Sequence, residues 1–151
     1  MIASVFPTIG KTILSKHHCL YVDLNSKNFN EIKAVYTDWW KIYCDIALDL
    51  EKQGYVVLIW TKNNIHEYLQ QRAKQYCMIM YDISLKEEVL SKAKTREIFD
   101  PQPGTYSFIL KNFDKTYQDL LNISQQHNIE LHLISSMDYN LEDILKESMY
   151  E

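Results

Sequence analysis

Two uninterrupted apolar runs constrain the fold of this chain most strongly. Residues 55–60 read YVVLIW and residues 76–81 read YCMIMY, and neither run contains a charged residue. A strand that faces water on one side alternates apolar and polar residues, whereas a strand covered on both faces is apolar along its whole length. Both runs therefore predict strands buried inside a sheet. Shorter apolar segments at residues 1–5, 20–22 and 129–134 predict three more strands.

Segments with helical periodicity separate the predicted strands. Apolar residues recur at helical spacing over residues 31–53, which predicts one long helix that ends at Gly54. Ser84 and Glu87 have the spacing of a capping box, so a helix is expected to begin at Ser84 and to run to about residue 99. Further helices are expected after residue 10, after residue 64, over residues 106–126 and over residues 141–149, with a loop at residues 100–104.

The alternation of strands and helices predicts the fold class. A parallel pair of strands needs a long crossover connection, which is usually a helix. We therefore predict an α/β fold of three layers, in which a mostly parallel five-stranded sheet has helices on both faces. A chain of 151 residues has the size of one domain, so residues 1–151 are expected to form a single unit.

Charge and cysteine content limit the kinds of protein that fit. The formal net charge of −4 argues against a nucleic-acid-binding surface over the whole molecule, although a local basic patch is compatible with it. Cys19, Cys44 and Cys77 each lie in an apolar stretch without a C-x-x-C spacing, so we expect reduced core residues in a cytoplasmic protein. The sequence has neither a signal-peptide pattern nor an apolar run of membrane-spanning length, so no membrane association is expected.

The segment after the first predicted strand carries the most informative motif. It reads FPTIGKT, and its last three residues match the second half of the Walker A pattern G-x-x-x-x-G-K-[ST], with Val5 at the first glycine. In such a loop the backbone N–H groups face a phosphate, Lys11 supplies positive charge, and Thr12 offers a hydroxyl to Mg²⁺. The residues expected to bind phosphate are Thr8, Ile9, Gly10, Lys11 and Thr12. The alternative is an ordinary turn and helix start.

Asp23 is the second candidate, because it ends the second predicted strand. Ligands of parallel α/β sheets bind beyond the carboxyl ends of the strands. Beside a triphosphate, this carboxylate can accept a proton from an attacking hydroxyl, orient it, or help to hold magnesium. The alternative is an Asx turn or helix cap with Asn25 and Ser26. Thr61, after the third strand, likewise faces the ligand or caps the next helix.

A cationic helix follows the fourth predicted strand. Lys92, Lys94 and Arg96 can close over phosphates as a lid and neutralise charge. A solvated helix face is the alternative, since glutamates are interspersed among them. The histidines lack metal-ligand spacing and are expected in surface or core roles. Of the neighbouring Trp39 and Trp40, one should face the core while the other is exposed or packs at a pocket rim.

These segments together resemble small P-loop proteins encoded by bacteriophages, described as nucleotide-kinase-like or ATPase-like. The loop at residues 6–12 is similar to x-F-P-x-x-G-K-[ST], and residues 23–29 are similar to D-x-[DN]-S-x-x-F. Residues 84–88 (SLKEE) look like the start of the lid, and residues 139–144 look like the family's Y-L-x-D-I ending with one residue inserted. The resemblance implies a P-loop NTPase-like fold related to nucleoside monophosphate kinases, with Mg²⁺ and ATP as cofactor and phosphoryl donor. It also implies a viral protein in the host cytoplasm.

Two functions are compatible with these residues. The first is a P-loop phosphotransferase that moves the γ-phosphoryl group from Mg-ATP to a nucleotide or modified nucleotide. Its catalytic residues would be Lys11 and Asp23, its magnesium ligand Thr12, and its lid Lys92, Lys94 and Arg96. The second is a degenerate P-loop scaffold from a phage, which binds and inhibits a host defence protein without catalysis. The acidic balance and an exposed tryptophan would suit that use. A nucleotide-binding ATPase or sensor is a third interpretation.

Overall fold

The structure is a computed structural model that describes residues 1–99 and 104–150. Five strands in these residues form one sheet in the order β2-β3-β1-β4-β5, and every neighbouring pair is parallel. The strands are β1 (Ile2–Val5), β2 (Tyr21–Leu24), β3 (Val56–Ile59), β4 (Tyr76–Tyr81) and β5 (Glu130–Ile134). The predicted five-stranded α/β sheet is thus confirmed, and it is parallel throughout. This strand order is consistent with both Rossmann-like and P-loop-like folds.

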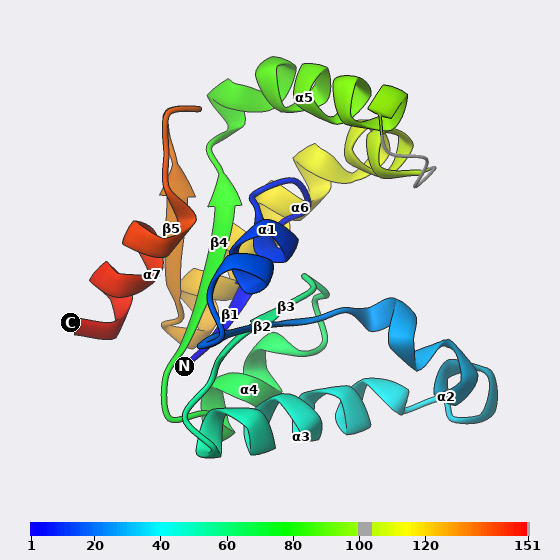
Figure 1. Ribbon diagram of the computed structural model, residues 1–151, viewed down its shortest axis with the longest axis vertical. Coiled ribbons are helices and arrows are strands. Elements are labelled where there is room, and N and C mark those ends of the chain that lie inside the picture. The colour runs from blue at the N-terminus through cyan, green and yellow to red at the C-terminus, as the bar shows by residue number, and fades with distance from the viewer. Residues whose placement is uncertain (100–103, 151) are drawn as a thin grey trace.

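Helices cover both faces of the sheet (Figure 1). Helices α1 and α7 contact each other on one face, whereas α3 packs on β1 and β3, and α6 packs on β4 and β5, on the opposite face. Helix α5 lies across the carboxyl ends of the strands. The helices are α1 (Lys11–His17), η1 (Ser26–Phe29), α2 (Asn30–Val35), α3 (Trp39–Lys52), α4 (His66–Arg72), η2 (Ile83–Leu85), α5 (Lys86–Phe99), α6 (Thr105–His127) and α7 (Leu141–Tyr150).

Burial follows the hydrophobic pattern of the sequence. Strands β1, β3 and β4 are buried along their whole lengths, as their apolar sequences predict. Helix α1, which follows β1, lies on one face, whereas α3 and α6, which precede β3 and β5, lie on the other. The carboxyl end of β1 is therefore the point where ligands of open α/β sheets bind. None of the helices in residues 1–99 and 104–150 combines the length and apolarity needed to cross a bilayer.

The prediction of one long helix over residues 31–53 is wrong in one respect, because the structure has two helices there, α2 and α3. Residues 36–38 separate the two helices, and the side chains of Val35 and Tyr36 are exposed rather than part of an apolar stripe. The β-branched Val35 and Thr37, together with Asp38, have low helix propensity. The break lets α3 begin at Trp39, whose indole stacks on Trp60.

Two smaller predictions also need correction. Ser84 does not cap α5: its backbone N–H and hydroxyl both donate to Asp82, which caps η2, and α5 begins at Lys86. Cys44 and Cys77 are buried as predicted, but Cys19 is exposed because it lies in the turn between α1 and β2, before the apolar strand begins. The predicted loop at residues 100–104 lies outside the described residues except for Gly104, which precedes α6.

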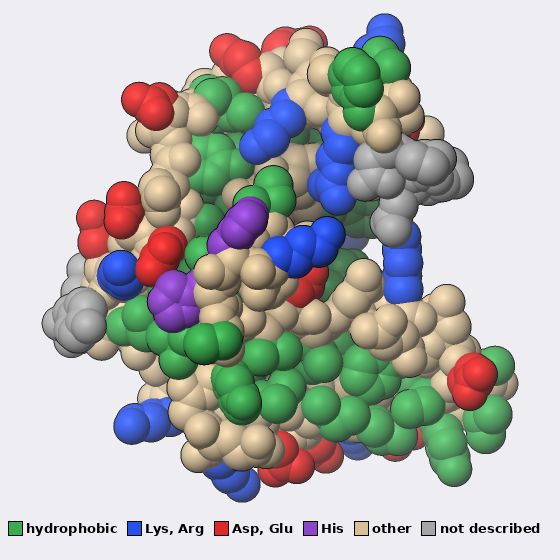
Figure 2. Space-filling view, in the orientation of Figure 1, with side chains coloured by type: hydrophobic (Ala, Val, Ile, Leu, Met, Phe, Trp, Pro, Cys, Tyr) green, Lys and Arg blue, Asp and Glu red, His purple; other side chains and the backbone are tan. Residues whose placement is uncertain are grey.

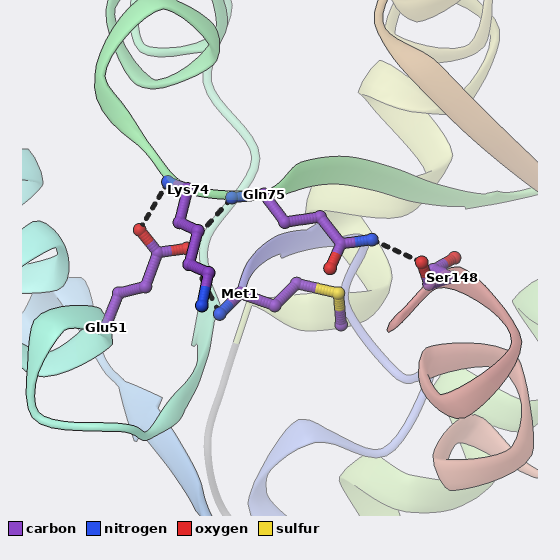
Figure 3. Close-up of polar contacts among 5 residues, drawn as sticks. All are labelled: Met1, Glu51, Lys74, Gln75 and Ser148. Carbon is purple, nitrogen blue, oxygen red and sulfur yellow. Dashed lines mark hydrogen bonds and ion pairs between the residues drawn. The ribbon is translucent and has the colours of Figure 1, made fainter. Parts of the chain in front are cut away.

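A buried glutamate joins several segments at the amino ends of the strands (Figure 3). The Glu51 carboxylate, at the end of α3, lies 3.1 Å from the N-terminal ammonium of Met1. It also accepts hydrogen bonds from the backbone N–H groups of Lys74 (2.7 Å) and Gln75 (3.2 Å). The Gln75 side chain in turn donates to the carbonyl of Ser148 in α7. This cluster fixes α3 and α7 to the strand end opposite the cleft described below.

Candidate functional site

A large cleft lies beyond the carboxyl ends of the strands. Its volume is about 1170 Å³, and it is bounded by the loop after β1, the segment after β2, and one face of α5. Figure 2 shows the molecule hollowed below α5, with lysine or arginine side chains around the hollow. The lining residues that sequence analysis singled out are Thr8, Ile9, Gly10, Lys11, Thr12, Asp23, Lys92 and Arg96. The structure therefore brings most of the candidate residues to one place.

The loop between β1 and α1 does not need the first Walker glycine. Val5 is the last residue of β1 and is fully buried, so valine fits its extended backbone without strain. The chain instead turns in the left-handed region at Thr8 (φ 74°) and Gly10 (φ 118°). Gly10 is the residue type that adopts this conformation freely, whereas Thr8 adopts it at a cost of roughly 1–2 kcal/mol. The Thr8 hydroxyl lies 3.1 Å from the buried Tyr81 hydroxyl, which helps to hold the strained residue.

Lys11 closes this loop from inside. Its Nζ donates a hydrogen bond of 3.0 Å to the carbonyl of Val5, so the ammonium lies within the turn of the backbone. Burial lowers the pKa of Lys11 to about 8; the Asp23 carboxylate opposes this change and the Arg96 guanidinium adds to it. An ammonium that has lost much of its hydration and has a carbonyl as its hydrogen-bond acceptor is poised to bind an anion.

Thr12 and Asp23 form a hydrogen-bonded pair beside Lys11. The Thr12 hydroxyl donates to the Asp23 carboxylate over 2.8 Å. The local Asx turn, one alternative for Asp23, is instead formed by Asn25, whose side chain accepts from the Lys27 N–H over 2.9 Å. Thr61 does not cap the next helix, because its hydroxyl lies 2.9 Å from that of Ser4 and α4 has no side-chain cap. Asp23 therefore presents its carboxylate to the cleft.

Two tyrosines that sequence analysis did not single out brace the loop. The Tyr139 hydroxyl, before α7, donates to the Ile9 carbonyl over 3.1 Å and lies 2.9 Å from the Tyr81 hydroxyl. Tyr81 ends β4 and reaches Thr8. The chain from Tyr139 through Tyr81 to Thr8 therefore ties the loop after β1 to two distant segments. No local signal marks Tyr139, because its role depends on a contact 130 residues away.

Of the three candidate lid residues on α5, only two have side chains that line the cleft. Lys92 and Arg96 line the cleft, as residues four apart on one helix face do, but Lys94 is not among the lining residues. Two helical positions turn the chain by about 200°, which directs Lys94 away from the face that Lys92 occupies. Lys92 donates to the Tyr139 hydroxyl over 3.1 Å, and burial together with Arg96 lowers its pKa.

Of the two neighbouring tryptophans, the sequence predicts that one faces the core and that the other is exposed or packs at a pocket rim. In the structure both pack against the core, and Trp39 also contacts the rim of the cleft through Trp60. Trp39 and Trp40 are both half-buried. Trp39 stacks on Trp60 with ring centroids 5.8 Å apart and planes inclined by 27°, whereas Trp40 packs edge-on against Tyr68. Trp60 follows β3 and lines the cleft. The aromatic surface at the rim of the cleft thus comes from Trp60, and Trp39 supports it.

No protein-family model matches the chain, and the search of curated proteins found no similar sequence. Within residues 1–99 and 104–150, no group of three histidine, cysteine or acidic side chains is arranged to hold a metal ion. Of the histidines, His66 is fully buried with its Nδ1 2.6 Å from the Tyr76 hydroxyl, whereas His17 lines the cleft. The functional argument therefore depends on the geometry of the cleft.

Proposed function

We propose that this protein is a P-loop phosphotransferase that moves the γ-phosphoryl group of Mg-ATP to a nucleotide or modified nucleotide. The observation that carries the proposal is the Lys11 ammonium, enclosed by the loop after β1 and adjacent to the Thr12–Asp23 pair. The loop follows the first strand of a parallel sheet and lies at the point where such sheets bind ligands. This arrangement supports a P-loop NTPase-like fold.

The donor phosphates fit the loop side of the cleft. The loop residues would bind them through backbone N–H groups, and Lys11 would exchange its bond to the Val5 carbonyl for a phosphate oxygen. Arg96 would contribute a second positive charge from α5. Because phosphoryl transfer depends on positioning and charge neutralisation, few side chains are needed.

The Thr12–Asp23 pair suits magnesium. Hydroxyl and carboxylate oxygens are the ligands that Mg²⁺ prefers, and the ion commonly takes only one or two protein ligands in addition to phosphates and water. Thr12 and Asp23 would hold it, and the bound ion neutralises charge on the phosphate oxygens. Asp23 would also orient the acceptor hydroxyl, since its carboxylate lines the cleft.

The test is a titration of ATP with and without Mg²⁺, followed by melting temperature and by hydrolysis. A ligand that binds only the folded state raises the free energy of unfolding by about 2.7 kcal/mol at a free concentration of a hundred times its Kd. That gain raises the melting temperature by roughly 5–10 °C for a chain of this size. Lys11→Ala should abolish the shift. Lys94→Ala, which removes the same charge outside the cleft, should retain it.

A panel of deoxynucleoside monophosphates then tests phosphoryl transfer. Transfer to one of them supports the proposal. An absent ATP shift in the wild-type protein contradicts it. The same absence of a shift favours the alternative, a degenerate P-loop scaffold from a phage that binds a host protein without catalysis, whereas a shift without transfer points to an acceptor outside the panel.

A further inference from the structure

A cluster of two tryptophans and two lysines adjoins the cleft at Trp60. We call it the tryptophan–lysine cluster, and its members are Lys33, Trp39, Trp60 and Lys62. The Nζ atoms of Lys33 and Lys62 lie 4.5 Å and 5.0 Å from the ring centroid of Trp39. They lie 5.9 Å and 5.4 Å from that of Trp60. Three separate segments, α2, the start of α3 and the loop after β3, bring these residues together.

The cluster is held rigidly at the ends of two strands. The Tyr43 hydroxyl donates to the Leu24 carbonyl at the end of β2 over 2.6 Å and accepts from the Trp60 N–H over 3.1 Å. The Trp39 ring packs edge-on against the buried Tyr43 ring, with centroids 6.1 Å apart. Trp39 and Trp60 are half-buried, so part of the paired ring surface faces solvent beside the cleft. A site built on such supports is pre-organised for a ligand.

The ammonium groups of Lys33 and Lys62 have no negatively charged partner within the part of the chain that the structure describes. Among the described residues, no ion pair or carboxylate hydrogen bond includes Lys33 or Lys62. Burial lowers the pKa of Lys33, and repulsion by the neighbouring Lys62 ammonium lowers it further. Aromatic faces attract cations but do not neutralise them. An anion that binds between the lysines therefore removes a repulsion as well as adding an attraction.

We propose that the tryptophan–lysine cluster binds the acceptor nucleotide, with its base against the indole rings and its phosphate between Lys33 and Lys62. Only the identification of this ligand as the phosphoryl acceptor rests on the proposed function; the binding itself requires no ATP. Base–aromatic stacking and lysine–phosphate contacts are the usual means by which proteins hold a nucleotide. The ligand is a base with an attached phosphate, either a free nucleotide or the phosphorylated end of an oligonucleotide.

Tryptophan fluorescence tests the proposal directly, because two of the three tryptophans in the chain belong to the cluster. The titrations use a Trp40→Phe background with the four deoxynucleoside 5′-monophosphates, the corresponding nucleosides, and inorganic phosphate. At least one monophosphate should quench the emission. Its nucleoside and inorganic phosphate should bind at least about tenfold more weakly, because each supplies half of the recognised chemistry.

Variants of the lysines supply the matched control. Lys33→Gln and Lys62→Gln should each weaken monophosphate binding by about tenfold to a hundredfold. Lys41→Gln should leave it unchanged, because Lys41 lies outside the cluster, 5.5 Å from the ring centroid at position 40, which is a tryptophan in the natural chain and a phenylalanine in this background. Melting curves confirm that each variant folds. Unchanged binding in both cluster variants, or no quenching by any monophosphate, overturns the proposal.

The proposal and the function on which it rests can fail separately. Lys11→Ala should abolish the ATP-induced melting shift and leave monophosphate quenching intact. Quenching that depends on the cluster lysines, without any ATP shift in the wild-type protein, supports the cluster and contradicts the phosphotransferase. An ATP-induced melting shift without quenching by any monophosphate supports ATP binding at the loop after β1 and contradicts the cluster as a nucleotide site. A 5′-phosphorylated oligonucleotide that binds more tightly than its monophosphate identifies a strand end as the ligand; equal or weaker binding identifies the free nucleotide.

Discussion

Replacement of Glu51 by alanine should be among the most destabilising single changes outside the hydrophobic core. The side chain is 5% exposed, and its carboxylate accepts from two backbone N–H groups and contacts the N-terminal ammonium of Met1, a buried residue. Alanine leaves all three donors unpaired in a place with little access to water. An unpaired buried donor costs about 1–3 kcal/mol, and loss of one partner of a buried ion pair costs about 3–5 kcal/mol. Because these terms overlap, we expect a total loss of about 4 kcal/mol.

Urea denaturation followed by circular dichroism measures this loss. With roughly 2–4 °C of melting temperature per kcal/mol in a chain of this length, the melting temperature should fall by about 8–16 °C. Glu51→Gln keeps one carbonyl acceptor and should lose roughly half as much. Asp49→Ala, an exposed acidic residue on the same helix, serves as the control and should change stability by less than about 0.5 kcal/mol.

The expectation is refuted by a free energy of unfolding for Glu51→Ala that is within about 1 kcal/mol of the value for Asp49→Ala, with an unchanged denaturant slope. That result would mean that water reaches the three donors and that the carboxylate is not the element that joins α3 to the strand after α4. A reduced slope would instead indicate a change in the denatured or native ensemble. The melting temperatures of the two variants would then show whether Glu51→Ala is less stable than Asp49→Ala.

Three further predictions concern titration and the loop after β1. Burial lowers the pKa of His66 to about 4, so the unfolded chain binds a proton between pH 6.5 and 4 that the folded chain excludes. Stability should therefore fall by about 3 kcal/mol as the pH is lowered across that window, and urea titrations should find a smaller fall in His66→Gln. Because burial lowers the pKa of Lys11 to about 8, ATP affinity should decrease above that pH, by up to about tenfold per pH unit, which calorimetry over a pH series measures. Tyr139→Phe removes the bonds to Ile9 and Tyr81, so it should lower stability by about 1–2 kcal/mol and weaken ATP binding about tenfold. Tyr36→Phe, at an exposed position, should change neither quantity.

Several elements of this protein were predictable from sequence because their cause is local. The run YCMIMY became β4 with the expected bounds, since only a strand covered on both faces tolerates six consecutive residues of this kind. Gly10 was identifiable because a left-handed turn between a strand and a helix strongly favours glycine. The placement of Asp23 beside the loop followed from parallel topology, which gathers the carboxyl ends of strands at one edge of the sheet.

The remaining features depended on which segments meet in space. Hydrophobic periodicity alone did not divide residues 31–53 into two helices, and the stacking of the first residue of α3, Trp39, on Trp60 joins segments that are distant in the chain. The same holds for the lid, where helix geometry directs Lys92 and Arg96 toward the cleft and Lys94 away from it. Where Lys94 points could be judged only once the face of α5 was known.

The sequence by itself determined the five-stranded α/β sheet and the candidate loop at residues 8–12. Only the tertiary structure decided how that loop is supported: Tyr139 and Tyr81 hold the strained Thr8 and its neighbour Ile9. The physical reason is the range of the interactions. Strand and helix formation depend on neighbours in the chain, whereas the hydrogen bonds and charges of the site join residues that lie up to 131 positions apart.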